Sequence, residues 1–248
     1  MRLSKRLKSV AGLAGVCGTV ADVGTDHGYI PVFLVGSKKA DYAIAMDVNP
    51  GPLRRAKEHI AAYGMEHQIE ARLSDGLSAL SPGEADTVVI AGMGGSLMMR
   101  ILSQGEGVAM SARKLVLQPQ SEIQAFREFL YEHGYRMAAE DMVWEDGKYY
   151  PMMAVQPVWE GRMDPASWMP SRLEGIAARI VFRYGPLLLQ QGHPVLRQYL
   201  LQQQKQKQGI LTHFISNARQ DSGDRAAELR RELEDIEEAL RIVRGAGA

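Results

Sequence analysis

The chain has 248 residues, of which 46% are hydrophobic and 23% charged, and its formal net charge at pH 7 is zero. These values are typical of a soluble globular protein that buries one large α/β domain with a smaller addition. The single cysteine, Cys17, excludes an intrachain disulfide and a cysteine-based metal cluster, which fits a reducing compartment. We expect Cys17 to be a small buried residue.

The N-terminal segment combines basic and small apolar residues, as a signal peptide does. Cleavage near Ala21 would destroy the motif that follows, whereas Leu3, Leu7 and Val10 form one face of a basic amphipathic helix. The longest uncharged run, residues 87–99, is too short and too rich in glycine to span a bilayer. We therefore expect a cytoplasmic protein with no membrane partner.

Short apolar segments alternate with helical patterns through residue 158. The predicted strands cover 20–24, 42–47, 69–75, 87–95 and 114–119. Helices are predicted over 50–64 and 121–135, the second with Ser121 as its N-cap. Residues 137–158 predict a hairpin that turns at Asp146 and Gly147. This order indicates an α/β, doubly wound and mostly parallel sheet that binds its ligand at the carboxyl ends of the strands.

The pattern after residue 160 is helical. A helix is predicted from 171 to about 184, and two longer helices carry apolar seams separated by a turn at 217–225. The first seam contains Leu196, Leu200, Gln203, Ile210 and Phe214, and the second contains Leu229, Leu233, Ile236, Leu240 and Val243. We expect an antiparallel helical pair, and hence two domains, 1–160 and 161–248. The seams could instead join two chains, although we favour a monomer.

Charge is unevenly distributed along the chain. Residues 1–161 carry 16 basic and 19 acidic side chains, residues 162–220 carry eight and two, and residues 221–248 carry five and eight. The basic middle segment and the basic N-terminus could bind phosphates, or they could simply be solvated helix faces.

The sequence ADVGTDHGYIP, residues 21–31, follows the first predicted strand. Its glycines, Gly24 and Gly28, allow a ligand to approach the backbone closely, and the next helix presents free N–H groups. The usual dinucleotide pattern is G-x-G-x-x-G, but here Asp26 stands inside the loop and would repel a pyrophosphate. The loop favours a ligand that is positively charged and has no phosphate.

S-adenosylmethionine has these properties, because it carries a sulfonium, an ammonium and an adenosine. An acid at the end of the second strand suits the ribose, and Asp47 lies 23 residues beyond Gly24. Asp75, at the end of the third strand, is placed to accept from the adenine amino group. An aspartate before a turn is common, but the ordered set of three strand-end acids favours this cofactor.

The fourth strand ends in residues 91–95, AGMGG, where the methyl acceptor should enter. Enzymes that methylate exocyclic amines of bases usually carry an Asn- or Asp-Pro-Pro-aromatic motif there, and this chain has none. A glycine turn better suits a ring nitrogen, whose lone pair needs no proton removed. A tight turn before a helix is the alternative reading.

The motifs DVGTDHGYIP, IAGMGG and LQPQ, in this order and followed by a helical hairpin, resemble the bacterial tRNA (adenine-22, N1) methyltransferases. The resemblance covers essentially the whole chain, but Gln120 stands where the family more often has Asn. It implies a Rossmann-like class I methyltransferase domain, S-adenosyl-L-methionine as cofactor and tRNA as partner. The cofactor-binding residues would be Asp22, Gly24, Thr25, His27, Gly28, Asp47, Asp75, Gly76 and Gly92. Substrate-binding residues would be Lys5, Arg6, Tyr29, Met93, Gly94 and Gln118.

Asp26 is the expected catalytic residue. Its carboxylate would accept a hydrogen bond from the amine of the target adenine and place N1 in line with the methyl group, or it would steady the sulfonium. His27 would orient the loop or meet substrate, and a structural hydrogen bond is equally compatible with its position. Tyr29 would stack on a base or form a wall. No metal site is expected, because the six histidines are scattered.

Unstacking a base costs free energy that contacts elsewhere must offset. We expect those contacts from Lys5, Arg6 and several of Arg172, Arg179, Arg183 and Arg197. Two other classes remain open, a small-molecule methyltransferase and a non-catalytic RNA-binding protein on the same scaffold.

Overall fold

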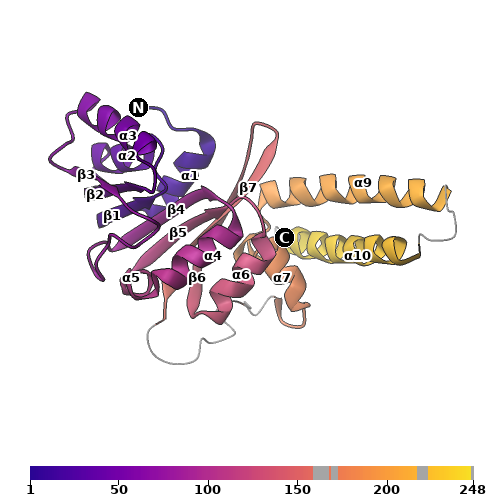
Figure 1. Ribbon diagram of the computed structural model, residues 1–248. Helices are drawn as coiled ribbons and strands as arrows, with labels where there is room; N and C mark the ends of the chain where they lie inside the picture. The colour runs from indigo at the N-terminus through magenta and orange to yellow at the C-terminus, as the bar shows by residue number, and fades with distance from the viewer. Residues whose placement is uncertain (159–167, 169–172, 217–222, 247–248) are drawn as a thin grey trace. The chain divides into compact units, whose positions relative to one another are not determined.

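The computed structural model describes residues 1–158, 168, 173–216 and 223–246. The chain divides into two compact units, Met1–Trp168 and Met169–Ala248 (Figure 1). Trp168 belongs to the first unit, where it is buried and its indole N–H donates to the carbonyl of Tyr135 at 2.7 Å. Within the described residues, no helix has both the length and the apolar character needed to cross a membrane.

The first unit is a seven-stranded sheet with helices on both faces. Its helices are α1 (Lys5–Ala14), α2 (Tyr29–Gly36), α3 (Pro50–Ala62), α4 (Gly95–Gln104), α5 (Glu106–Ser111) and α6 (Ile123–Glu132). Its strands are β1 (Cys17–Val23), β2 (Ala40–Asp47), β3 (Ile69–Leu73), β4 (Thr87–Met93), β5 (Lys114–Pro119), β6 (Tyr135–Glu145) and β7 (Lys148–Pro157).

The strand order is β3-β2-β1-β4-β5-β7-β6. The first five strands are parallel, whereas β7 pairs antiparallel with both β5 and β6. Figure 1 shows α1, α2 and α3 on one face of this sheet and α4, α5 and α6 on the other. The predicted doubly wound sheet is confirmed. The strand order reverses between β1 and β4, which remain parallel, and such sheets bind ligands at this switch point.

Helix α1 is held on the sheet along its length. Ser4 caps its first turn by accepting from the N–H of Leu7, and the backbone N–H of Lys5 donates to Glu145 Oε1 at 2.6 Å. At the other end, Lys114 Nζ donates to the carbonyl of Ala14 at 2.7 Å. Val10 is fully buried, in agreement with the predicted amphipathic face.

Several predicted boundaries are wrong. The third strand ends at Leu73, two residues early, and α6 begins at Ile123 with Glu122 as its N-cap in a left-handed conformation, φ 49°. The hydroxyl of Ser121 donates to the Glu122 carboxylate instead of capping the helix.

Cys17, which was expected to be buried, is half-buried. Burial and the Asp86 carboxylate raise the pKa of its thiol. The hairpin turn at Asp146 and Gly147 is confirmed, since both residues have positive φ.

The second unit is entirely helical in the part that the structure describes. It contains α7 (Ala178–Tyr184), α8 (Pro186–Gln190), α9 (Pro194–Ser216) and α10 (Gly223–Gly245). The predicted helix from 171 therefore begins at Ala178, and residues 171 and 172 lie outside the described part. The predicted turn at 217–225 includes 217–222, also outside it, while the residues from Gly223 onward are helical.

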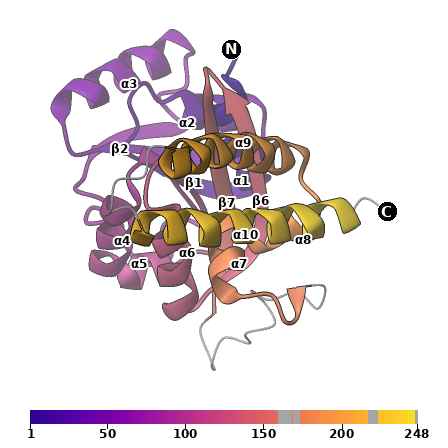
Figure 2. The same cartoon turned by 90° about the vertical axis from the view of Figure 1, so that its right-hand side faces the viewer.

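Helices α9 and α10 lie side by side and antiparallel (Figures 1 and 2). The seam of α10 is buried throughout, at Leu229, Leu233, Ile236, Leu240 and Val243. The seam of α9 is buried at Leu196 and Leu200 but not at Ile210, which is exposed. The heptad prediction is confirmed for one helix and for the first turns of the other.

Candidate active site

The parallel register brings four strand ends to one edge of the sheet. Val23 pairs with Met46 on one side and with Ile90 on the other, and Asp47 pairs with Leu73. The segments that follow these residues therefore begin at the same level. They contain the glycine loop at 24–28, Asp47, Asp75 and the turn at 92–95, as the sequence order of the acids predicted.

The loop between β1 and α2 folds around its glycines and Thr25. Gly24 has φ 77° and Gly28 has φ 63°, a region that other residues adopt only with strain. The N–H groups of Gly24 and Thr25 both donate to the carbonyl of Met46 at 2.8 Å. Thr25 Oγ1 accepts from the N–H of Gly28 at 3.2 Å, which closes the loop at the first turn of α2. The result is a fixed backbone cradle beside the start of a helix.

Asp22 lies buried beneath this loop, with 6% of its surface exposed. Burial raises the pKa of Asp22 to about 6, a hydrogen bond with Thr25 opposes this shift, and the charge of Asp47 adds to it. A buried carboxylate with so high a pKa is stabilised by an incoming cation. The sequence placed the preference for a cation on Asp26 of the loop, and the structure adds Asp22 as a second, buried carboxyl beside it.

Asp47 and Asp75 differ in how firmly they are held. Asp47 is half-buried, and its Oδ1 accepts from the N–H of Asn49 at 2.7 Å, which leaves Oδ2 for a ligand. Asp75 is exposed at the edge. The neighbouring Gly76, with φ 57°, is buried, and a Cβ there would stand 3.0 Å from Ile101, so α4 packs against this turn.

The turn after β4 consists largely of glycines, and side chains from other segments pack closely against its backbone. Gly92 has φ 84°, and the side chain of Met93 lies directly over Gly24, where its methyl group occupies the position a Cβ would take. A Cβ on Gly94 would come within 3.0 Å of the Ser121 hydroxyl. The glycines of this turn thus allow two strand-end loops to approach each other.

Asp26 projects from the loop with 63% of its side chain exposed. It forms an ion pair with Arg55 of α3, whose Nε lies 3.1 Å from Asp26 Oδ1, and His27 Nε2 lies 3.4 Å from Asp26 Oδ2. Arg55 was not predicted from sequence, because a helix residue 29 positions away carries no local signal of this contact. The expected catalytic carboxylate is therefore accessible and balanced by a cation.

Arg6 also reaches this edge of the sheet. Its Nη1 donates to Gln118 Oε1 at 2.9 Å, its guanidinium lies 5.6 Å from the Tyr150 ring centroid, and a Cβ on Gly92 would lie 3.6 Å from Nη1. Gln118 is fully buried, and its Nε2 donates to the carbonyl of Pro119 at 3.0 Å. Arg6 thus lines the turn after β4, whereas the expectation from sequence was a phosphate contact.

Comparison with known proteins places these features in one family. The sequence pattern of a family described as "Methyltransferase domain" matches residues 3–153. The tRNA (adenine(22)-N(1))-methyltransferase of Bacillus subtilis (strain 168) is 33% identical over 243 residues, 98% of this chain and 97% of that one. The chain belongs to this methyltransferase family.

Solved structures of the family have the same fold over nearly the whole chain. The crystal structure of the B. subtilis M1A22 tRNA methyltransferase TrmK superposes with a TM-score of 0.81 and 31% identity, covering 96% of this chain and 99% of that one. Streptococcus pneumoniae Sp1610 in complex with S-adenosyl-L-methionine gives 0.80 and 30%, covering 96% and 100%. The C-terminal helices are therefore included in the similarity.

The residues at the strand ends fit the cofactor that methyltransferases of this kind use. A buried carboxylate (Asp22) suits the cationic end, a half-buried one (Asp47) suits a diol, and the positive-φ glycines leave the loop without side chains. No group of three or more His, Cys, Asp or Glu side chains able to hold a metal occurs among the described residues.

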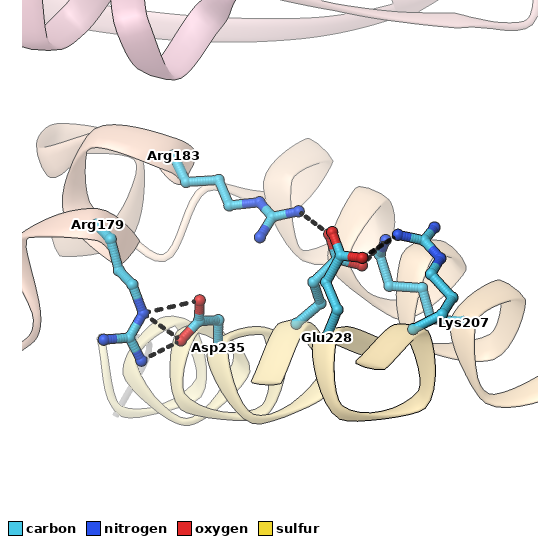
Figure 3. A network of polar contacts seen from close by, with 7 residues as sticks. Arg179, Arg183, Lys207, Glu228 and Asp235 are labelled. Atoms are coloured by element: carbon cyan, nitrogen blue, oxygen red, sulfur yellow. Dashed lines mark hydrogen bonds and ion pairs between the residues drawn. The ribbon is translucent and has the colours of Figure 1, made fainter. Parts of the chain in front are cut away.

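The expected RNA-binding arginines of the second unit have partners inside it. Arg179 binds Asp235 through two nitrogens, with Nη2 to Oδ1 at 2.7 Å, and Arg183 Nη2 lies 3.2 Å from Glu232 Oε1 (Figure 3). Lys207 also pairs with Glu232. Arg172 lies outside the described residues, and Arg197 is exposed on α9. The contacts give Arg179 and Arg183 a structural role that the sequence did not reveal.

Proposed function

We propose that this protein methylates N1 of adenine 22 in tRNA, using S-adenosyl-L-methionine. The observation that carries the proposal is the ordered set of strand-end acids around the loop at 24–28, in a chain 33% identical over 98% of its length to an enzyme of that name. The absence of an Asn- or Asp-Pro-Pro motif after β4 supports a ring nitrogen as acceptor. We further propose that the enzyme acts as a cytoplasmic monomer.

Residues of the first unit would hold the cofactor. Asp47 Oδ2 would bind the ribose hydroxyls, Asp75 would accept from the adenine amine, and Gly24, Thr25, Gly28 and Gly76 would shape the backbone around it. Asp22 would provide the buried negative charge for the cationic end. When bound, the cofactor supplies an electrophilic methyl group on a sulfonium.

The chain's own part in the reaction is to position the base. The N1 lone pair attacks the methyl carbon, the carbon–sulfur bond breaks, and positive charge moves from sulfur to the base, so no proton has to be removed. Asp26 would accept a hydrogen bond from the exocyclic amine, which aligns N1 and stabilises the cation formed. To do so, Asp26 shares its ion pair with Arg55 or gives it up. Both side chains are exposed to water, so the loss of the ion pair costs little free energy.

The turn after β4 would form the wall against which the base enters. Gly92 and Gly94 leave room there, Met93 covers Gly24, and Arg6 with Gln118 supplies polar groups. Phosphate contacts would come from exposed cations such as Lys5 and Arg197. We assign catalysis to the first unit and tRNA retention to the helical unit.

The test is methyl transfer from labelled cofactor to unmodified bulk tRNA, followed by nucleoside analysis. The expected product is 1-methyladenosine, and it should be absent when an otherwise identical tRNA carries guanine at position 22. Cofactor binding without label in RNA would overturn the proposal and favour a small-molecule methyltransferase.

A further inference from the structure

Four aromatic rings form a continuous row that starts at the candidate catalytic loop. The rings of His27 and Tyr29 are stacked, with centroids 5.1 Å apart and an interplanar angle of 24°. Tyr29 meets His59 edge-on at 5.1 Å, and His59 meets Tyr63 edge-on at 5.0 Å. We call His27, Tyr29, His59 and Tyr63 the aromatic row.

The row is built by two segments that the fold brings together. His27 and Tyr29 belong to the loop and to the start of α2. His59 lies on α3, one turn after Arg55, and Tyr63 is the C-cap residue that follows this helix, four positions further on. His59 Nδ1 lies 2.9 Å from the carbonyl oxygen of His27, which fixes the helix against the loop. The row therefore begins beside Asp26 and continues toward the C-terminal end of α3.

The two tyrosines of the row are exposed and its two histidines are half-buried, which distinguishes the row from core packing. The chain has nine tyrosines, all within the described residues, and Tyr29 (41%) and Tyr63 (43%) are the two classed as exposed. An aromatic side chain left in water loses the stabilisation that burial would give it. Both exposed tyrosines nevertheless stand in the same row, which starts at the loop that carries Asp26.

The surroundings of the row are positively charged. Helix α3 exposes Arg54, Arg55 and Lys57 against one acid of its own, Glu58. Arg55 is paired with Asp26 of the loop, so the exposed cations still outnumber the exposed acids here by one. Exposed aromatic rings interleaved with cations are the pattern that proteins use for unpaired nucleotides, because every base has a face that stacks and every linkage carries a negative charge. The same arrangement does not suit a purely apolar protein partner.

We propose that the aromatic row is a stacking platform for the unpaired nucleotides next to the target adenine. It depends on the proposed tRNA substrate and adds a specific surface for it on α3. A base taken out of its stack needs a partner for its neighbours, and the row provides one within reach of Asp26. Tyr63 and His59 act in binding, at a distance from the reacting atoms.

Tyr63 is the residue to test, because it stands furthest along the row from Asp26. We expect Tyr63→Ala to raise KM for tRNA about tenfold, the scale of losing one stacked base, while kcat and cofactor affinity stay unchanged. Tyr63→Phe keeps the ring and should keep wild-type KM. His67→Ala removes an exposed ring four residues after Tyr63 in the sequence, outside the row, and serves as the matched control.

A fluorescence assay measures stacking directly, using tRNA that carries 2-aminopurine at the nucleotide beside the target adenine. Binding of wild-type protein should change the 2-aminopurine fluorescence, because the modified base stacks on the row. The single variants Tyr63→Ala and His59→Ala should each abolish that change. Unaltered fluorescence and KM in both folded variants would overturn the platform. If wild type binds this RNA but methylates nothing, the proposed function fails, and the fluorescence of the two variants still decides the platform.

Discussion

Asp26 of the β1–α2 loop and Arg55 of α3 form an ion pair at the mouth of the site, with Arg55 Nε 3.1 Å from Asp26 Oδ1. Their side chains are 63% and 43% exposed, so water screens the pair and separating it costs little. Arg55 thus orients the carboxylate of Asp26 through an exposed ion pair, which leaves that carboxylate free to turn to a substrate. An exposed pairing of this kind suits the transient contact with a base that we propose for Asp26.

Asp26→Ala should lower kcat for tRNA methylation about a hundredfold, because it removes a group placed to stabilise developing charge. Cofactor affinity should stay within about threefold of wild type if Asp26 acts on the base. Single-turnover methylation and calorimetric cofactor titration separate the two effects. A large loss of cofactor affinity would instead assign Asp26 to the sulfonium. Arg55→Ala, which leaves the carboxylate in place, should have a smaller effect on kcat.

Asp47→Ala should weaken cofactor binding about tenfold to a hundredfold, the range for losing a hydrogen bond to a charged group. The matched control is Asp41→Ala, an exposed aspartate at the opposite end of the same strand, β2. Isothermal titration with S-adenosylhomocysteine measures both variants. Equal losses in the two, or none in Asp47→Ala, would remove the ribose role from Asp47.

Asp22 should make stability depend on pH. Its folded pKa of about 6 lies above the ordinary value of 3.8, so the folded state holds the proton more tightly. This contribution is complete below about pH 4 and is lost as pH rises through about 6, with a total of about 3 kcal/mol. Urea unfolding across this range should show wild type losing stability relative to Asp22→Asn. A parallel pH dependence in the two proteins would contradict the assignment.

Cofactor affinity should increase with pH over the range in which Asp22 ionises, whereas the stability contribution of Asp22 decreases there. A cation bound near Asp22 favours the ionised form, so binding releases a proton and tightens as pH rises through about 6. Asp22→Asn should lose this dependence. Titrations in buffers of different ionisation enthalpy report the released proton directly.

Arg127 and Glu140 form a buried ion pair, with side chains 1% and 0% exposed and Nη2 2.9 Å from Oε1. Arg127→Met alone should destabilise the protein by roughly 3 to 5 kcal/mol, because it leaves an uncompensated buried charge. Adding Glu140→Leu should restore much of that loss. Denaturant unfolding of the single and double variants checks the sign of the coupling. Additive losses would show that packing, not charge, dominates this position.

The arginines of the second unit should separate into two groups. Arg179→Ala breaks the pairing with the largely buried Asp235 and should lower the stability of the helical unit, seen as faster limited proteolysis of α9 and α10. Arg197→Ala should leave proteolysis unchanged and reduce the salt dependence of tRNA binding by about one phosphate contact. An unchanged salt slope would exclude Arg197 from the interface.

The parallel sheet, the loop at 24–28 and the strand-end position of the acids could be predicted from local sequence patterns. These depend on local rules: apolar runs of strand length, glycine where φ is positive, and carboxyl ends that must share one edge in a parallel sheet. The antiparallel helical pair was predicted from the heptad spacing of its apolar residues, which is also a local rule. The positions of Asp22, Asp47 and Asp75 at one edge of the sheet therefore followed from the sequence.

The contacts between side chains that are distant in sequence could not be predicted and are known from the folded structure alone. The pairing of Asp26 with Arg55, the reach of Arg6 to Gln118 and the ring contacts between α2 and α3 join residues 29 to 112 positions apart. Likewise, Arg179 and Arg183 look free for phosphates in sequence but are paired with Asp235 and Glu232. The physical reason is that periodicity specifies which face of an element is buried, whereas contacts between elements depend on packing that no local pattern encodes.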